Sequence, residues 1–463
     1  MSYINIRELG AKGDGQSHDT RAFAAATRLC AEHGGGRILV PPGRYLTGSV
    51  ILGDHTELHL RAGATILGSQ NPDDYPVVTS QWEGRQVPTH SGLIHAQGAT
   101  GITLSGRGTI DGQGSYWWRR VRAAGQHPRP RMIALTQCRD VRISGLTLVN
   151  SPAWTVHPLG CHNLSISGLT LRNPHDSPNT DGINPESCQA VRISDCHIDV
   201  GDDCIAIKAG ASEDGQGAYE PCQDILISNC TLCSGHGGVV IGSEMSGGVR
   251  RVAITNCIFL GTDRGIRVKS RRGRGGAVED LRCCNLIMQD VGCPLVLHTY
   301  YRYGAIPPTQ RDYVADRAPQ PVDRRTPIIR NLHLANVTAR NVLGPALAFI
   351  YGLPEMPVGP LTLDQVELAA SSEMDPRMAE PAMMVWDHAY EEGGLFATHA
   401  RDLRLRGVVL SPRRGPALRL QHARGVRGDV QVSRGGAAEL IDAADTQLDL
   451  RDTDGRPLAC VAR

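Results

Sequence analysis

Short runs in which apolar and polar residues alternate recur through the middle of the chain. Five of them read VRISGLTL from 141, LSISGLTL from 164, VRISDCHI from 191, ILISNCTL from 225 and VAITNCIF from 252. Such alternation is typical of short strands that bury one face. Their aligned isoleucines are separated by 23, 27, 34 and 27 residues, and stand at Ile143, Ile166, Ile193, Ile227 and Ile254. The pattern therefore predicts a repeating β architecture with one coil per repeat.

A second set of aligned positions, one in each repeat and named the turn column, supports the same architecture. Two residues after the aligned apolar position, these runs and four fainter copies have only Gly, Asp or Asn: Gly106, Gly145, Gly168, Asp195, Asn229, Asn256, Asn285, Asn336 and Gly407. These residue types tolerate a left-handed backbone, so we expect a turn there in every coil. Coils of two or three short strands would stack in parallel at about 4.8 Å. A propeller would need a more even period of about 40 residues.

We therefore predict an all-β fold, a right-handed parallel β-helix. Cys196, Cys230 and Cys257 follow the turn column and would form a column of small apolar side chains inside the stack. All 14 cysteines are expected to be free thiols, mostly buried. Only one CxxC pair is present, which does not complete a zinc site, and we expect no metal and no cofactor.

The N-terminal segment 17–36, SHDTRAFAAATRLCAEHGGG, predicts a helix that caps the first coil. Asp19 or Thr20 could cap its start, and Phe23, Ala26 and Cys30 share one face. We expect one domain over residues 1–463, with the cap at about 1–45, coils at about 46–430 and weak strands at 431–463. Segments 302–327 and 367–398 interrupt the rhythm and are interpreted as long loops.

The composition of the chain limits which binding partners and which location we expect. The net charge of +1 gives no electrostatic reason to expect nucleic acid. No apolar run approaches the about 18 residues that a membrane span needs. The first residues do not resemble a secretory signal, so we expect a cytoplasmic location, and we expect a monomer.

The candidate chemistry lies in four successive coils, just before or within the second strand of each. These segments read NTDGIN from 179, GDDCIAIK from 201, GHGGVVIG from 235 and GIRVKS from 265. Stacking would bring together Asn179, Asp181, Asp202, Asp203, His236, Arg267 and Lys269. Taken singly, such an Asp usually bonds local backbone, such a His is usually structural, and such cations are usually solvated. Their joint position at one register predicts a functional site.

Adjacent Asp202 and Asp203 would point to opposite faces of a regular strand. Both can reach one cleft only if the chain turns there, which Gly201 permits. Three neighbouring carboxylates cannot all ionise cheaply, so one of them should keep its proton. A protonated acid beside ionised carboxylates is what glycosidic cleavage requires. Nearby Arg and Lys suit a substrate that itself has carboxylates.

These segments resemble the four signature motifs of glycoside hydrolase family 28, the polygalacturonases: NTDG, GDDCIAIKAG, GHGGVVIGSE and RGIRVKSRRGRGG. The stretches LGAKGDGQSHDTRAFAAA and GRGTIDGQG resemble bacterial members, and the resemblance covers roughly residues 5–430. It implies inverting hydrolysis of α-1,4-galacturonosidic bonds in a pectic oligo- or polysaccharide.

The resemblance also implies residue roles. Asp202 would be the general acid, while Asp181 and Asp203 would position and deprotonate a water. His236 would tune the protonation of the acid. The implied substrate-binding residues are Asn179 at the −1 sugar and Arg267 and Lys269 at a galacturonate carboxylate. A downstream tyrosine is also implied, and Tyr300, Tyr301 and Tyr303 are all candidates.

Several alternatives stay open. Close carboxylates generally suggest retention, whereas the family is inverting, and we follow the family. Arg271, Arg272 and Arg274 could form a solvated basic turn or further subsites. The insertion 210–221 and the loop 302–327 could wall off the groove, so we expect exo-action with release of galacturonic acid. Endo-action, a rhamnogalacturonan-type hydrolase, a calcium-dependent pectate lyase and a non-catalytic glycan-binding solenoid are the alternatives.

Overall fold

The computed structural model describes residues 3–124, 129–212, 219–303, 310–385, 390–432, 441–451, 456–457 and 461–462. The chain divides into two compact units, each considered by itself. Unit 1 comprises Met1–Ala206 and Cys222–Leu226, and unit 2 comprises Ile207–Pro221 and Ile227–Arg463. The expected single domain over 1–463 stays a prediction.

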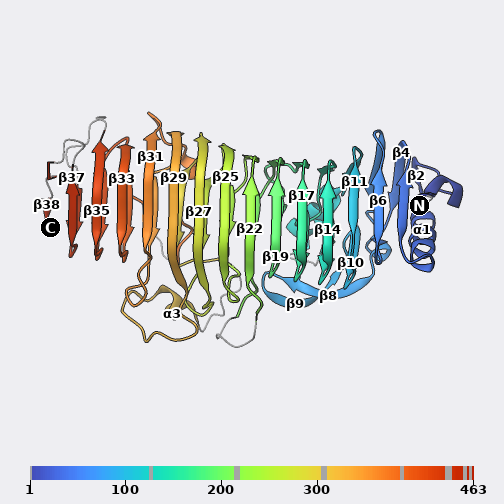
Figure 1. Ribbon diagram of the computed structural model, residues 1–463, viewed down its shortest axis with the longest axis horizontal. Coiled ribbons are helices and arrows are strands. Elements are labelled where there is room, and N and C mark those ends of the chain that lie inside the picture. The colour runs from blue at the N-terminus through green and yellow to red at the C-terminus, as the bar shows by residue number, and fades with distance from the viewer. Residues whose placement is uncertain are drawn as a thin grey trace. The chain divides into compact units, whose positions relative to one another are not determined.

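Unit 1 contains three stacks of parallel strands (Figure 1). The first stack consists of β1 (Tyr3–Asn5), β3 (Gly36–Val40), β6 (Thr56–Leu60), β11 (Thr103–Gly106), β14 (Arg139–Ser144), β17 (His162–Ser167) and β19 (Gln189–Ser194). The second consists of β2 (Asp14–His18), β4 (Gly43–Thr47), β7 (Ala64–Gly68), β12 (Thr109–Asp111), β15 (Thr147–Val149), β18 (Thr170–Arg172) and β20 (His197–Asp199). The third consists of β5 (Val50–Ile51), β10 (Ile94–Gln97), β13 (Ile133–Thr136) and β16 (Val156–Leu159). Two further strands contain residues of both units, β21 (Ile205–Ile207) and β22 (Cys222–Ser228).

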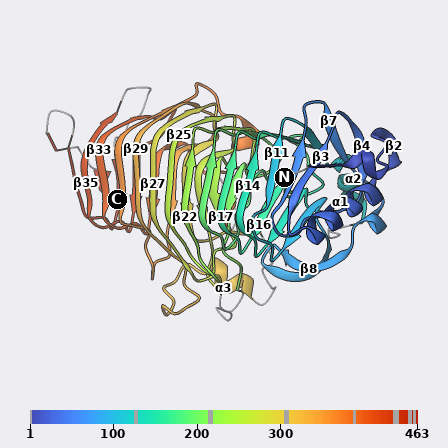
Figure 2. The same cartoon turned by 45° about the vertical axis from the view of Figure 1, so that its right-hand side comes forward.

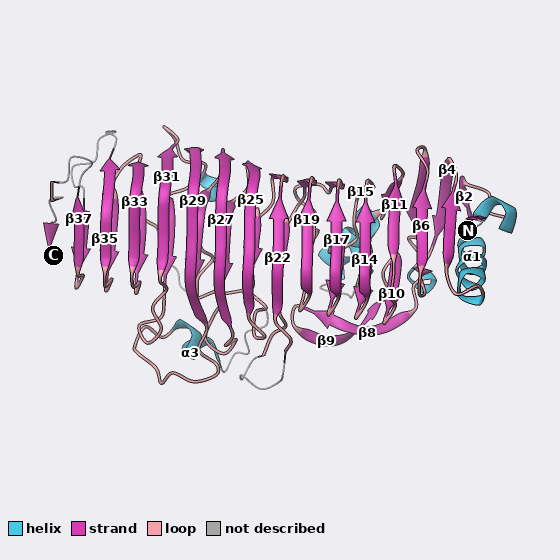
Figure 3. Cartoon of the chain, viewed as in Figure 1, coloured by secondary structure: helices cyan, strands magenta, loops and turns pink. Residues whose placement is uncertain are grey.

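Unit 2 repeats the arrangement with longer strands. One stack consists of β25 (Val249–Leu260), β27 (Ala277–Gln289), β29 (Ile328–Val342), β31 (Leu361–Ala370), β33 (Leu403–Ser411), β35 (Val426–Val432) and β37 (Leu448–Arg451), with β23 (Thr231–Cys233) paired to β25. The other consists of β24 (Val239–Ile241), β26 (Arg264–Lys269), β28 (Cys293–His298), β30 (Ala346–Tyr351), β32 (Gly393–Thr398), β34 (Leu418–Gln421), β36 (Ile441–Ala444) and β38 (Val461–Ala462). Strands far outnumber helices among the described residues (Figure 3), and the predicted parallel β-helix is confirmed.

The register of the coils follows the two sequence columns. Ile143 pairs with Ile166, and Ile166 pairs with Ile193, all three fully buried. Every residue of the predicted turn column has a left-handed backbone, with φ between 52° at Asn336 and 116° at Gly106. In unit 2 the column forms a side-chain ladder, because Asn285 donates to Asn256 at 3.1 Å and Asn336 donates to Asn285 at 2.8 Å. The turn positions therefore add hydrogen bonds between coils as well as backbone geometry.

The N-terminal cap is α1 (Thr20–Glu32), close to β2 and β4 at the N-terminal end of unit 1 (Figure 2). Phe23, Ala26 and Cys30 are buried, as their spacing predicts. Asp19 occupies the N-cap position, but its carboxylate accepts from the backbone N–H of Lys12 at 2.6 Å instead of capping the helix. The other described helices are short: η1 (Ile6–Leu9), η2 (Pro72–Asp74), α2 (Gly114–Ala124), α3 (Arg311–Ala315) and η4 (Pro376–Met378). None of the helices in the described part of the chain is long and apolar enough to span a membrane.

An antiparallel hairpin, β8 (Val77–Trp82) and β9 (Arg85–His90), departs from the coils of unit 1. It was not expected, since residues 46–430 were predicted to form coils. It runs across the ends of the coil strands in Figure 1. The loop 302–327 contains α3. The second predicted loop, 367–398, is wrong at both ends, because β31 continues to Ala370 and β32 begins at Gly393.

The cysteines within the described residues are free, as predicted, and all are buried except Cys233 and Cys284, which are half-buried. The expected internal column is confirmed, because Cys196, Cys230 and Cys257 are each at most 3% exposed. Cys460 lies outside the described residues.

Candidate active site

Three carboxylates meet in unit 1, at the end of the stack that contains β16. Ile183 pairs in parallel with Ile205 of β21, which places Asp181 and Asp203 at equivalent positions of neighbouring coils. The backbone N–H of Gly182 donates to the carbonyl oxygen of Asp203 at 3.0 Å. One oxygen from each of Asp181, Asp202 and Asp203 lies within 4.8 Å of the other two. The structure therefore brings together the three carboxylates that the motifs singled out.

The backbone before β21 explains how adjacent aspartates reach the same place. A Cβ on Gly201 would lie 2.5 Å from the carbonyl oxygen of Pro174 and 2.6 Å from that of Ser177, so only glycine fits this close approach. The backbone N–H of Asp203 donates to Oδ1 of Asp202 at 2.9 Å, which orients that carboxylate. Asp203 is buried and Asp202 is half-buried. Asp202 is thus the more accessible member of the pair.

Asn179 is held beside this cluster by Arg129, a residue that lies outside all four motifs. Nη2 of Arg129 donates to Oδ1 of Asn179 at 2.7 Å, and Nη1 donates to the carbonyl oxygen of Pro178 at 2.8 Å. Burial lowers the pKa of Arg129 to about 10, and the negative charges of Asp181, Glu83 and Asp202 act in the opposite direction. Arg129 therefore adds a buried positive charge near the carboxylates. It lies outside the repeated strands, so no periodic pattern marked it.

The tip of the β8–β9 hairpin is also anchored next to the cluster. Trp82 stacks on Trp154, with ring centroids 5.0 Å apart and planes 5° apart. The guanidinium of Arg131 lies 5.4 Å from the Trp82 ring and 5.0 Å from the Trp154 ring. Thr155, the residue after Trp154, donates its backbone N–H to the carbonyl oxygen of Asp181 at 2.8 Å. The hairpin therefore forms a wall beside the carboxylates that the repeat pattern did not indicate.

His236 lies in unit 2, just before β24. Its Nδ1 is 2.8 Å from Oδ2 of Asp263, and its side chain is 50% exposed. Burial acts to raise the pKa of Asp263, but the His236 hydrogen bond and the charge of Arg264 outweigh it and lower that pKa. Asp263 therefore orients the imidazole. This partner was not identified from the motifs.

Arg267 and Lys269 lie two residues apart on β26, and both are buried, which excludes their interpretation as solvated strand cations. The Arg267 guanidinium is 5.5 Å from the ring centroid of Tyr301, and Nζ of Lys269 is 5.1 Å from it. Tyr300 is fully buried and packs against Arg272 and Arg317 instead. Tyr303 is 48% exposed and packs on Arg302. Of the three candidate tyrosines, Tyr301 is thus the one that contacts the predicted carboxylate-binding cations.

The remaining arginines of this motif are buried. Arg271, Arg272 and Arg274 are at most 1% exposed, so the interpretation as a solvated basic turn is wrong. Arg272 donates to both carboxylate oxygens of Glu355, at 2.7 and 2.8 Å, and also to the carbonyl oxygens of Tyr313, Asp316 and Ala318. It therefore ties the segment around α3 to the loop after β30.

The three carboxylates of unit 1 offer only oxygen atoms, which allows two kinds of chemistry. Three carboxylate oxygens within 4.8 Å could bind a hard cation such as Ca²⁺, which prefers oxygen ligands. The same cluster can perform acid–base catalysis, because carboxyl groups can donate and accept protons and three of them lie together here. The catalytic roles of Asp181, Asp202, Asp203 and His236 stay predictions, as do the binding roles of Asn179, Arg267 and Lys269.

Comparison with known proteins assigns the chain to a family of enzymes. The model of the glycosyl hydrolases family 28 matches residues 30–314. A probable polygalacturonase of Vitis vinifera is 35% identical over 385 residues, which cover 80% of this chain and 76% of that protein.

Solved structures agree with this assignment. The hyperthermoactive exopolygalacturonase of Thermotoga maritima is 26% identical, with a TM-score of 0.67 over 80% of this chain and 87% of that chain. The family 28 exopolygalacturonase of Yersinia enterocolitica shares the fold, at 21% identity and a TM-score of 0.70 over 99% of this chain and 79% of that chain. The chain therefore belongs to the glycosyl hydrolases of family 28 and is a glycoside hydrolase.

Proposed function

We propose that this enzyme hydrolyses α-1,4-galacturonosidic bonds in homogalacturonan or its oligosaccharides and releases galacturonic acid from the non-reducing end. The observation that supports hydrolysis most directly is the cluster of Asp181, Asp202 and Asp203, whose oxygens lie within 4.8 Å of one another. Glycosidic cleavage needs one group to protonate the leaving oxygen and another to activate water. The cluster has enough carboxylates for both tasks.

In this proposal Asp202 protonates the leaving oxygen, because it is the more exposed member of the adjacent pair. Asp181 and Asp203, at equivalent positions of neighbouring coils, hold and deprotonate one water. Arg129 keeps Asn179 in place at the −1 sugar. His236, oriented by Asp263, influences the protonation of the acid. Arg267 and Lys269, both in contact with Tyr301, bind a galacturonate carboxylate.

Exo-action is supported by the elements that depart from the coils. The β8–β9 hairpin adds a wall beside the carboxylates in unit 1, through the Trp82–Trp154 stack. The insertion 210–221 and the loop 302–327 were expected to close the groove, although residues 213–218 and 304–309 lie outside the described part of the chain. The Thermotoga maritima relative is named an exopolygalacturonase. Monomeric state and cytoplasmic location stay predictions.

The attack mode can be tested by chromatography of early products from tri-galacturonate and from long polygalacturonate. We expect galacturonic acid as the first product from both, because a walled groove accepts a chain end and not the middle of a chain. Random oligomers from the long substrate would show endo-action instead. Absorbance from unsaturated products would indicate elimination, and failure to cleave either substrate would contradict the proposal altogether.

We further propose that cleavage inverts the anomeric configuration. The short separation of the carboxylates would by itself favour retention, which usually needs about 5 Å, against about 6.5–9.5 Å for inversion. The paired positions of Asp181 and Asp203 favour a shared water over direct attack by either carboxylate. Proton NMR of the first turnovers should therefore show the β-anomer of the new reducing end, followed by mutarotation. An initial α-anomer would contradict inversion and would identify one aspartate as a nucleophile.

A further inference from the structure

The side-chain amide of Asn184 contacts one of the three clustered carboxylates and has no role in the catalytic scheme described so far. Its Nδ2 donates to Oδ2 of Asp181 at 2.9 Å. Asn184 is fully buried, and Asp181 is 4% exposed. Hydrogen bonds to an ionised carboxylate are shorter and stronger than those between neutral groups. The amide can therefore hold the Asp181 side chain in one orientation.

The backbone around this contact is held by the neighbouring coils. The N–H of Asn184 donates to the carbonyl oxygen of Val156 at 2.8 Å. Ile183, which precedes it, pairs in parallel with Val156 on one side and with Ile205 on the other. The contribution of the Asn184 amide is therefore the orientation of the Asp181 carboxylate, since the backbone has its own hydrogen bonds.

The second polar atom of the amide shows that packing alone does not explain an asparagine at this position. Oδ1 of Asn184 is buried without a hydrogen-bond partner among the described residues. A buried polar atom without a partner destabilises the folded state, so an apolar side chain of the same shape would suit the fold at least as well. The asparagine is better explained by the hydrogen bond that its Nδ2 donates to Asp181.

The orientation of the Asp181 carboxylate matters because of the group on the next coil. Asp181 and Asp203 occupy equivalent positions of neighbouring coils, and an oxygen of each belongs to the set that lies within 4.8 Å. A water shared by two carboxylates must meet one oxygen of each, so the rotation of both side chains decides whether that water is held in line for attack. The hydrogen bond from Asn184 to Oδ2 fixes this rotation at Asp181.

We infer that Asn184 is a positioning residue for hydrolysis: its amide holds Oδ2 of Asp181 and so orients the carboxylate that shares the attacking water with Asp203. The inference rests on the proposed function, because it concerns the water step of that reaction. Asn184 is fully buried and acts through Asp181, without contact with the substrate. Its loss should therefore slow the reaction and leave substrate binding intact.

The first test compares Asn184→Leu with the control Asn150→Gly. Leucine has the branched shape of asparagine but no amide, so it removes the donor to Asp181 together with the unpartnered oxygen. Asn150 also donates to an aspartate, Asp111 at 3.1 Å, which lies outside the carboxylate cluster, and its φ of 52° suits glycine.

With tri-galacturonate we expect Asn184→Leu to lower kcat about tenfold to a hundredfold, the effect of misplacing a reacting group by about 1 Å, with KM within about twofold. Asn150→Gly should keep the kcat and the KM of the unchanged enzyme. The melting temperatures of both variants should stay close to that of the unchanged enzyme. An unchanged kcat in Asn184→Leu, or a change in KM alone, would overturn the inference.

A double-mutant cycle distinguishes an effect through Asp181 from a general structural defect. In the Asp181→Asn background the carboxylate is already absent, so adding Asn184→Leu should change kcat by less than about twofold. A structural defect would lower kcat by the same factor in both backgrounds, and that result would overturn the inference. If Asp181→Asn turns over too slowly to measure, the comparison of kcat and melting temperature between Asn184→Leu and Asn150→Gly decides.

Failure of the inference can be told from failure of the proposed function. If the unchanged enzyme cleaves neither tri-galacturonate nor polygalacturonate, the proposed function is wrong, and the inference fails with it. If the unchanged enzyme cleaves them and the two substitutions lower kcat independently, the proposed function stands and only the role of Asn184 is wrong.

Discussion

Replacing Asp202 by asparagine should lower kcat for oligogalacturonide hydrolysis by about a hundredfold to ten-thousandfold, the range that a general acid contributes. Asparagine retains the size of the side chain and can still accept the 2.9 Å hydrogen bond from the backbone N–H of Asp203. It cannot deliver a proton to the leaving oxygen. Because Asp202 is half-buried and not deep in the core, the fold should persist. Initial rates of reducing-sugar release from tri-galacturonate, with circular dichroism as a check of folding, would measure the effect.

The matched control is Asp195→Asn. Asp195 is exposed and occupies the turn column, where Asn229 and Asn256 stand in other coils with the same left-handed backbone. This change removes one carboxylate but keeps the turn. We therefore expect kcat within about twofold of the unchanged enzyme, and an unfolding free energy within about 0.5 kcal/mol of it, as usual for a surface substitution. Undiminished kcat in Asp202→Asn would exclude Asp202 as the acid. The assignment among the three carboxylates would then have to be revised.

The Arg272→Met variant should lose about 3–5 kcal/mol of unfolding free energy, the usual cost of breaking a buried ion pair from one side. The Arg272 side chain is fully buried, and that of Glu355 is 4% exposed. Removing the cation leaves the Glu355 carboxylate buried without its bidentate partner. The carbonyl oxygens of Tyr313, Asp316 and Ala318 lose a donor as well. Denaturant unfolding followed by fluorescence would measure the loss.

Two variants test the physical reason for this effect. Arg377→Met breaks a surface pair, in which Nη2 of Arg377 lies 2.6 Å from Oδ2 of Asp375 and the arginine side chain is 87% exposed, so it should cost far less unfolding free energy than Arg272→Met. Adding Glu355→Gln to Arg272→Met removes the stranded charge and should restore part of the stability. A loss of under 1 kcal/mol in Arg272→Met would show that the pair is not effectively buried.

Much of the fold follows from the sequence, because every coil of a β-helix needs the same kinds of residue at the same positions. Each coil needs one apolar residue facing inward and one residue that adopts a left-handed turn, and these needs recur at intervals that can be aligned. Ile143, Ile166 and Ile193 are therefore stacked in register as the alignment of the repeats predicts. Asn256 and Asn285 occupy turns for the same reason, although their ladder of hydrogen bonds is visible only in the structure.

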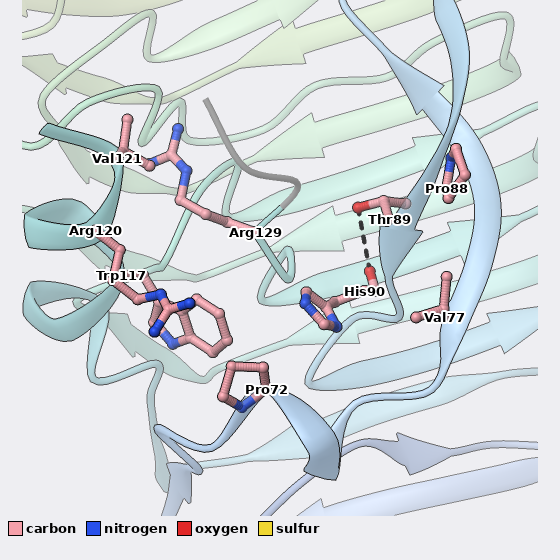
Figure 4. A pocket seen from close by; sticks show the side chains of 9 residues that line it. All are labelled: Pro72, Val77, Pro88, Thr89, His90, Trp117, Arg120, Val121 and Arg129. Carbon is pink, nitrogen blue, oxygen red and sulfur yellow. Dashed lines mark hydrogen bonds between the residues drawn. The ribbon is translucent and has the colours of Figure 1, made fainter. Parts of the chain in front are cut away.

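The β8–β9 hairpin and α2 do not follow from that reasoning. Each occurs once, so no second copy reveals its register, and its side chains pack on coils that are distant in sequence. Trp82, for example, stacks on Trp154, 72 positions further along the chain. A cavity at Trp117 is lined by these two elements together with Pro72 and Arg129 (Figure 4), so it could not be anticipated from either element alone.

The sequence by itself determined the parallel β-helix, the turn column and the grouping of Asp181 with Asp202 and Asp203, because stacking of repeats turns sequence spacing into spatial proximity. Only the tertiary structure decided the partners of the other motif residues: Arg129 at Asn179, Asp263 at His236, Tyr301 beside Arg267 and Lys269, and Glu355 in an ion pair with Arg272. The physical reason is that these partners come from loops, single insertions and side-chain directions. None of these repeats along the chain, and their geometry depends on packing between segments that are remote in sequence.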